Sequence, residues 1–109
     1  MASRILQVNF SLDMTIEDYQ GLADSLSDTF ANLPGLVWKI WLLNEAEREA
    51  GGLYLFDSDE SMEAYLDGPI VAALKSHPAI TNLNVKQFDV MPAVTAASRG
   101  PVTAGSIAR

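Results

Sequence analysis

The sequence contains no cysteine and only one histidine, His77. One chain therefore has no disulfide, no thiolate chemistry and no usual cysteine–histidine zinc site. The acidic run at residues 57–60 lacks the spacing and the glycine of an EF-hand calcium loop. It is typical of the start of a helix, where carboxylates favour the positive end of the helix dipole. We therefore expect no metal site.

Basic residues are also scarce, with seven Lys and Arg against fourteen Asp and Glu and a net charge of −7. This charge repels a phosphate backbone, so nucleic acid is not expected as a partner. No apolar run approaches the ~20 residues that a membrane-spanning helix requires. The N-terminus also lacks the basic and apolar regions of a secretory signal peptide. We expect no membrane association and a cytoplasmic location.

The patterns that are present predict one α+β domain. Apolar alternation predicts a strand over residues 4–11, and helical spacing follows from Thr15, a candidate N-cap, to the turn at Pro34–Gly35. Strands are expected at 36–43 and 52–56, then a helix that Ser58 caps and Gly68–Pro69 interrupts. The last strand covers about 82–90, with a β-bulge near Lys86. This β-α-β-β-α-β order is the ferredoxin-like arrangement over residues 1–92. Residues 93–109 read as a C-terminal tail, either disordered or clasping a partner subunit.

The second and third strands are apolar on both faces, although both helices of this topology cover the same face. The uncovered face would be an apolar patch of a size that monomers rarely expose. We therefore expect a two-fold homodimer, sheet against sheet. A Trp41→Asp substitution would disrupt that dimer if Trp41 lies in the interface. Lys39 lies on the Trp41 side of the second strand. We interpret it as a charge that protects a sheet edge, and we favour this interpretation over a catalytic role.

Three segments resemble the YdhR-like monooxygenase family. They are residues 34–41 (PGLVWKIW), 49–56 (EAGGLYLF) and 88–90 (FDV), and the resemblance extends from the strand at 6–10 to about residue 101. The patterns PGxxWKxW and EAGGxYLF occur together at the spacing of the family. The resemblance implies a dimeric α/β barrel. It also implies kinship with small cofactor-free monooxygenases of antibiotic biosynthesis, which oxidise aromatic substrates to quinones.

Oxygenation without a metal or flavin leaves the redox chemistry to the substrate, so no cofactor is expected. A phenol must lose its proton to become an electron-rich anion, which requires an apolar pocket, a base or anion stabiliser, and hydrogen-bond donors. Related quinone-forming enzymes use asparagine, tryptophan, tyrosine and arginine in this way. By residue type and strand placement, we predict catalytic roles for Asn9, Trp38 and Tyr54.

Further residues are candidates for binding a small aromatic or apolar molecule. Aromatic walls, a polar group on the first strand and a loop arginine fit this role: Trp41, Phe56, Tyr65, Gln7 and Arg48. The same aromatics also suit packing in the core or dimer interface, and Asn9 suits a hydrogen bond across the dimer. His77 is interpreted as a helix-terminating residue in preference to a base.

The sequence leaves several functions open. The first is a cofactor-independent monooxygenase that oxidises a small electron-rich aromatic with O2. The second is a non-catalytic binder of small apolar ligands, and the third is an isomerase or lyase on the same fold. The resemblance favours the first.

Overall fold

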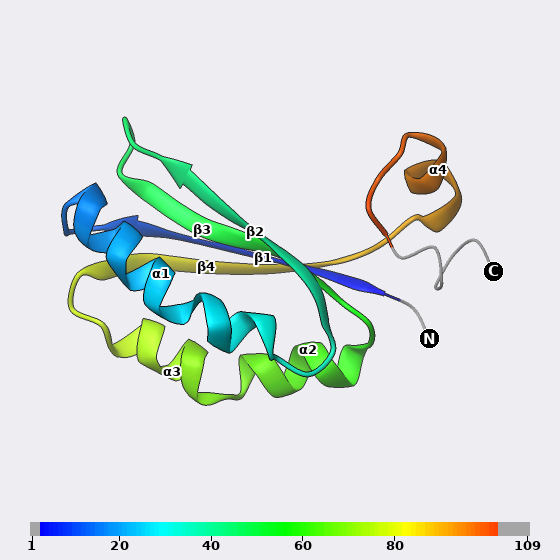
Figure 1. Cartoon of the computed structure of the whole chain (residues 1–109), viewed down its shortest axis with the longest axis horizontal. Coiled ribbons are helices and arrows are strands. Elements are labelled where there is room, and N and C mark those ends of the chain that lie inside the picture. Colours follow the sequence, from blue (N-terminus) through cyan, green and yellow to red (C-terminus); the bar gives the residue numbers. More distant parts are fainter. Residues whose placement is uncertain (1–2, 103–109) are drawn as a thin grey trace.

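Four antiparallel strands form one sheet in the order β2-β3-β1-β4 (Figure 1). The structure, a computed structural model, describes residues 3–102. The strands are β1 (Arg4–Leu12), β2 (Leu36–Asn44), β3 (Glu49–Phe56) and β4 (Ile80–Asp89), and the helices are α1 (Ile16–Ala31), α2 (Asp59–Leu66), α3 (Pro69–Ser76) and α4 (Pro92–Ala97). The predicted α+β ferredoxin-like order is confirmed, with the second helix divided into α2 and α3 at Gly68–Pro69.

The helices begin where the sequence predicts. The Thr15 hydroxyl accepts a hydrogen bond from the Asp18 amide at 3.0 Å, and the Ser58 hydroxyl accepts one from the Ser61 amide at 3.2 Å. Each bond satisfies an amide that has no partner within its own helix. The turn before β2 depends on Gly35, whose φ of 81° favours a residue without a side chain.

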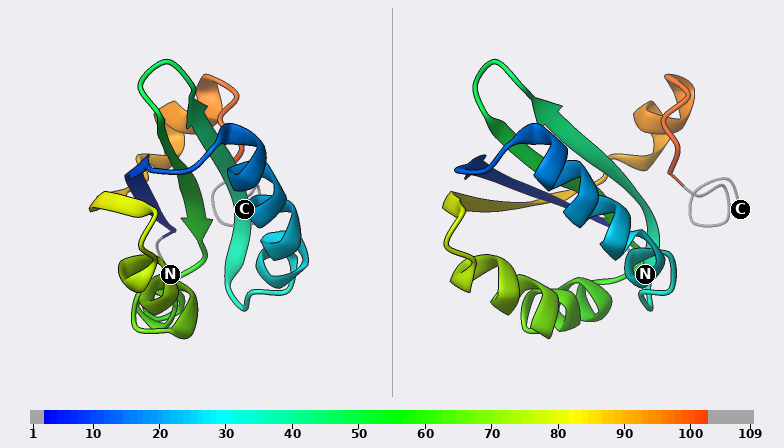
Figure 2. Two further views of the ribbon diagram at one scale, coloured as in Figure 1. Left: turned by 90° about the vertical axis from the view of Figure 1, so that its left-hand side faces the viewer. Right: turned by 60° about the vertical axis from the view of Figure 1, so that its left-hand side comes forward.

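The two faces of the sheet have different surroundings. Helices α1, α2 and α3 all lie against one face, which we call the helix side, and the other is the open side (Figure 1). Leu6, Val8, Phe10 and Leu12 of β1 are buried on the helix side. Figure 2 shows α1 beside the edge strand β2, whereas α3 lies under β4 at the opposite edge. The core therefore fills the space between one sheet face and three helices.

The predicted bulge near Lys86 is wrong, because Lys86 pairs in regular register with Gln7. The irregularity lies earlier in β4, where Asn82 and Leu83 together stand opposite the single residue Phe10. Asn82 has a φ of 55°, and asparagine tolerates this left-handed conformation better than most residues. Its side-chain amide donates to the Ser11 hydroxyl at 3.2 Å, which stabilises the bulge.

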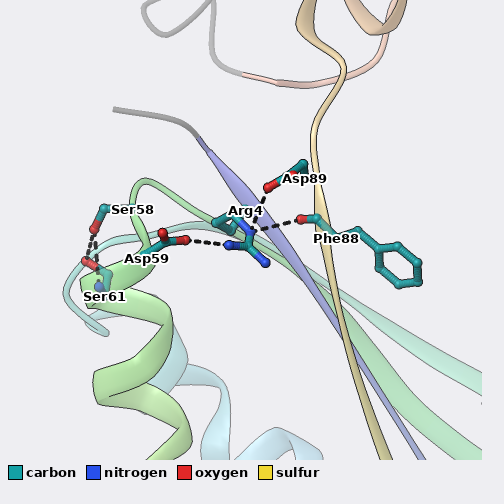
Figure 3. A network of polar contacts seen from close by, with 6 residues as sticks. All are labelled: Arg4, Ser58, Asp59, Ser61, Phe88 and Asp89. Carbon is teal, nitrogen blue, oxygen red and sulfur yellow. Dashed lines mark hydrogen bonds and ion pairs between the residues drawn. The ribbon is translucent and has the colours of Figure 1, made fainter.

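Arg4, at the start of β1, joins the helix layer to the sheet (Figure 3). Its guanidinium lies 2.7 Å from a carboxylate oxygen of Asp59 at the start of α2 and 3.2 Å from one of Asp89 at the end of β4. It also donates to the Phe88 carbonyl oxygen at 3.3 Å. Both carboxylates are largely exposed, so the contacts orient α2 more than they stabilise the fold.

The segment after β4 folds back on the open side. It contains the short helix α4, which stands beyond the end of the sheet and apart from α1–α3 (Figure 1). The Trp38 indole N–H donates to the Pro101 carbonyl oxygen at 2.6 Å, and Leu55 and Val102 are both buried. The predicted tail therefore contacts its own sheet at Pro101, and residues 103–109 lie outside the described part. Within residues 3–102, no helix has the length and apolar character needed to cross a membrane.

Candidate active site

A small cavity of ≈ 30 Å³, here called the inner cavity, lies between α1 and the helix side of the sheet. Side chains from five elements line it: Phe10 of β1, Tyr19, Leu22, Ala23, Leu26 and Phe30 of α1, Lys39 and Trp41 of β2, Tyr54 of β3, and Ile70 and Leu74 of α3. A cavity of this volume has room for about one or two molecules of the size of water. Its lining is almost wholly apolar and aromatic.

A second hollow, here called the outer groove, has a volume of ≈ 220 Å³ and lies between the C-terminal half of α1 and β2. Its lining includes Ser27, Phe30 and Ala31 of α1 and Val37, Trp38, Lys39 and Trp41 of β2. Three residues, Phe30, Lys39 and Trp41, line both spaces. Lys39 therefore stands where the outer groove meets the inner cavity.

Aromatic rings surround the amine of Lys39. Its Nζ lies 3.5 Å from the ring centroid of Phe30, 3.4 Å from that of Trp41 and 4.8 Å from that of Tyr54. Ring faces attract an ammonium group, which partly replaces the water that burial removes. The ion pairs within residues 3–102 are those of Arg4, and Lys39 has none.

The inward position of Lys39 follows from strand register. Lys39 of β2 pairs with Tyr54 of β3, and Tyr54 also pairs with Leu6 of β1 on the other side of β3. All three side chains therefore point to the helix side. Gly52, the next helix-side position of β3, leaves room for the lysine chain. A Cβ at Gly52 would lie 2.8 Å from Cε of Lys39.

Burial lowers the pKa of Lys39 to about 7. Removal of an ammonium from water disfavours its charged form, and no nearby carboxylate offsets that effect. Near neutral pH, about half of the amine is therefore unprotonated, which allows it to accept a proton or to act as a nucleophile.

Tyr54, whose ring lies next to the amine, forms a buried pair with Tyr65 of α2. The hydroxyl oxygens of Tyr54 and Tyr65 are 3.1 Å apart, and their ring centroids are 5.2 Å apart. Burial raises the pKa of both hydroxyls, and for Tyr54 the proximity of Tyr65 raises it further. Both stay protonated at neutral pH. The hydrogen bond between the two hydroxyls uses only one of their two protons. The other proton can therefore be donated to a ligand oxygen.

The family described as "Putative mono-oxygenase ydhR" matches residues 5–101. The chain belongs to this family. The match covers the site residues of β2 and β3 and reaches the segment that contacts Trp38. No curated protein sequence matches the chain.

Solved structures share the fold of this YdhR-family chain. NE2512, a protein of unknown function from Nitrosomonas europaea, is 22% identical with a TM-score of 0.65, over 85% of this chain and 93% of that one. SnoaB from Streptomyces nogalater, a cofactor-independent oxygenase, is 12% identical with a TM-score of 0.67, over 83% and 94%. A "putative antibiotic biosynthesis monooxygenase" from Deinococcus radiodurans is 16% identical with a TM-score of 0.65, over 83% and 94%. At these identities the similarities show the fold alone.

Four of the residues predicted for the site lie together on the helix side. Tyr54 and Trp41 line the inner cavity, and Tyr65 reaches it through its hydrogen bond to Tyr54. Phe56 is fully buried behind them, stacked on Tyr54 with ring centroids 6.1 Å apart. Trp41 makes an edge contact with Phe30, so it lies outside any interface on the open side.

Three other predicted residues point to the open side. Asn9 pairs with Gly51 and Asn84, and Gln7 with Leu53 and Lys86, in positions that alternate with the buried residues of β1. Asn9 lines a different hollow of ≈ 210 Å³ near the β2–β3 hairpin. The Trp38 indole is bonded to Pro101, although the residue also borders the outer groove. The sheet thus separates Asn9 and Gln7 from the Tyr54 hydroxyl.

Arg48 and His77 occupy turns. Arg48, with a φ of 51° in the β2–β3 hairpin, donates from its guanidinium to the carbonyl oxygen of Met14 before α1. Nδ1 of His77 accepts a hydrogen bond from the Ala79 amide at 3.0 Å, just after α3. This contact agrees with the helix-terminating interpretation of His77.

Three residues of the site, Lys39, Phe30 and Tyr19, were not predicted from the sequence. The predicted edge position of β2 is confirmed, but the Lys39 amine lies under α1 instead of in solvent. Two features of the sequence could have indicated the buried position of Lys39. Lys39 and Trp41 lie on the same face of the second strand, and the glycine pair 51–52 on the neighbouring strand leaves space beside them.

We expect Gly52→Ala to displace the Lys39 amine without unfolding the chain. The added Cβ lies 2.8 Å from Cε of Lys39, the far end of a flexible side chain that can move, and 3.0 Å from the Tyr54 ring, which must shift slightly. If the Lys39 amine is a catalytic group, oxygen uptake with an aromatic substrate should then fall by more than about 10-fold, since misplacement of such a group by about 1 Å is costly. Thermal unfolding and oxygen uptake measured on the same sample check this. Gly21→Ala is the control, because a Cβ there meets nothing within 4 Å. Unchanged uptake in Gly52→Ala would count against a role for the Lys39 position.

Proposed function

We propose that the protein is a cofactor-independent monooxygenase that oxidises a small electron-rich aromatic with O2 at Lys39. The observation that carries the proposal is the Lys39 amine, with a pKa of about 7, between a groove with aromatic walls and a small apolar cavity. Membership of a mono-oxygenase family and the shared fold of SnoaB support it.

The first step is removal of the phenolic proton. A phenol in the outer groove, packed on Phe30 and Trp41, presents its hydroxyl to the neutral Lys39 amine, which accepts the proton as a general base. The ammonium that forms lies beside the phenolate and stabilises it in a medium from which water is largely excluded.

The phenolate then transfers electrons to dioxygen, for which the apolar inner cavity has a suitable size. For a naphthol, a new C–O bond forms between dioxygen and the ring carbon opposite the hydroxyl. The C–H bond at that carbon then breaks with loss of its proton, and the O–O bond breaks so that the second oxygen atom leaves as water. The products are one naphthoquinone and one water from one naphthol and one O2. The substrate supplies all the electrons.

The proposal is tested by measuring oxygen uptake with protein freed of metal and flavin. Each of a panel of hydroquinones, naphthols and anthrones is supplied in turn as the substrate. We expect uptake that requires both substrate and Lys39. The variants Asn9→Ala, Trp38→Phe and Tyr54→Phe, measured in parallel, test the catalytic roles predicted from the sequence. Saturable binding without uptake would instead indicate a binder, and turnover without oxygen an isomerase or lyase.

We further propose that the protein is a homodimer formed by the open side of the sheet. Ile40 and Phe88 are 46% and 45% exposed on that side. Ile40 pairs with Leu53 of the central strand β3, and Phe88 of the edge strand β4 pairs with Ile5 of β1. A second copy related by a two-fold axis would cover these side chains. Asn9 and Gln7 would then lie in the interface, where an amide can bond across the axis.

Ile40→Asp should raise the dissociation constant of this dimer by more than about 100-fold, because a carboxylate would be buried without a partner. Leu43→Asp is the matched control. Leu43 lies on the same strand with a similar exposure of 40%, but points to the helix side. Sedimentation velocity distinguishes dimer from monomer. An unchanged sedimentation coefficient for Ile40→Asp, or dissociation of both variants, would contradict this interface.

A further inference from the structure

Lys39 differs from the other two lysines of the sequence, Lys75 and Lys86, which are exposed. Its amine is enclosed by rings, borders two hollows and has no ion pair within the described residues. A neutral amine in apolar surroundings is a nucleophile toward carbonyl carbon. We propose that Lys39 is a covalent binding site for small aromatic aldehydes, which form an imine with its amine while their ring lies in the outer groove.

The outer groove fits such a ligand. It holds ≈ 220 Å³, includes the aromatic side chains of Phe30 and Trp41 in its lining, and has Lys39 itself in its wall. An aldehyde bound there lies beside the Lys39 side chain. The remaining lining favours a neutral ligand, since neither hollow has a carboxylate, arginine or second lysine in its wall.

The titratable neighbours of the amine leave it free to react. Tyr19 of α1 and Tyr54 of β3 are the other titratable groups that line the inner cavity, and the outer groove has no titratable group besides Lys39. Burial raises the pKa of both tyrosines, so neither carries a negative charge that would hold Lys39 protonated. The Tyr54 hydroxyl remains a donor for the carbonyl oxygen.

The reaction balances without an added redox partner. The nitrogen lone pair of neutral Lys39 forms a C–N bond, and the carbonyl π pair moves to oxygen, which takes a proton. The resulting carbinolamine loses its hydroxyl as water, and a C=N bond forms. One amine and one aldehyde thus give one imine and one water, and hydrolysis reverses the step.

This site does not depend on the proposed oxygenase activity. Aldehyde capture uses the amine as a nucleophile and leaves O2 unused, whereas the oxygenase uses the amine as a base. Labelling of Lys39 without oxygen uptake would support the site and overturn the oxygenase. Oxygen uptake without labelling would do the reverse.

The experiment is reductive trapping of benzaldehyde by the full chain at pH 7 with cyanoborohydride, followed by peptide mapping. An ordinary lysine amine is only about one thousandth neutral at this pH, so we expect Lys39 to be labelled at least about 100-fold faster than Lys75 or Lys86. A sulfonated benzaldehyde should label Lys39 at least about 10-fold more slowly than benzaldehyde, since the groove offers its charge no partner.

Three variants test the assignment. Lys39→Met should abolish the fast label, and Lys86→Met should retain it. Ala31→Trp, which fills the outer groove from an exposed helix position, should slow labelling of Lys39 by more than about 10-fold, whereas Ala73→Trp, in a separate groove between α1 and α3, should not. Circular dichroism confirms that each variant is folded. Label spread evenly over the three lysines, label confined to the α-amino group, or equal rates in both tryptophan variants would overturn the proposal.

Discussion

Replacement of Lys39 by methionine is expected to reduce kcat/KM for oxidation of the aromatic substrate by about 100-fold or more. General base catalysis contributes about 10²–10⁴-fold, and methionine has a similar length but cannot accept a proton. Its side chain still packs against Phe30 and Trp41, so the site keeps its shape. Oxygen uptake at saturating and limiting substrate checks the prediction.

The pH dependence of the same reaction provides a second criterion. In the proposed mechanism the neutral amine is the active form, so kcat/KM should rise with pH through about 7, the pKa of Lys39. This rise should be absent from the residual activity of Lys39→Met. Lys75→Met, at an exposed position on α3, should keep both the rate and the profile. A Lys39→Met variant with undiminished kcat/KM would exclude the base.

Lys39→Met should lower the activity without lowering the stability of the fold. The Lys39 pKa is depressed from an ordinary value near 10.4 to about 7, so the unfolded chain binds more protons than the native one between these values. The free energy of unfolding therefore gains a contribution as pH rises from about 7 to about 10, and this contribution is absent below pH 7. Lys39→Met should remove that dependence and be at least as stable as the parent at neutral pH. Loss of activity is then not a result of unfolding.

Phe30→Ala is expected to reduce the free energy of unfolding by about 3–5 kcal/mol. Phe30 is buried and joins α1 to the sheet through ring contacts, with centroid distances of 5.4 Å to Trp41 and 5.9 Å to Tyr54 and Tyr65. Truncation would leave a cavity and remove these contacts at once. Urea denaturation followed by circular dichroism measures the loss.

Phe30→Leu is the graded control, because it retains most of the apolar volume and should cost clearly less. Both substitutions open the space around Lys39 to water, so the activity profile should also move to higher pH as the amine pKa rises. A loss below about 1 kcal/mol for Phe30→Ala, with no shift of the profile, would show that Phe30 does not enclose the amine.

Local features of the fold were accessible from the sequence because they depend on neighbouring residues. The caps at Thr15 and Ser58 and the break at Gly68–Pro69 follow from side chains within a few positions of each helix end. The bulge was misplaced because the φ of Asn82 depends on how β4 pairs with β1.

The site was less accessible because it depends on tertiary contacts. The alternation of β1 places Asn9 and Leu6 on opposite faces of the strand. Only the pairing of Leu6 with Tyr54 shows that Tyr54 faces the helices and that Asn9 faces the open side. For Lys39, an exposed edge charge was the reasonable expectation. Its burial requires Phe30 from a helix and Gly52 from another strand, and neither contact follows from periodicity.

The fate of the oxygen atoms in a single turnover tests the central claim most directly. Protein freed of metal and flavin would be mixed with a naphthol and ¹⁸O2 in unlabelled water, and the quinone analysed at once by mass spectrometry. We predict one ¹⁸O atom per quinone, formed at a rate that falls at least about 100-fold in Lys39→Met. A quinone without ¹⁸O, or labelled quinone formed equally fast by Lys39→Met, would contradict oxygenation at this site.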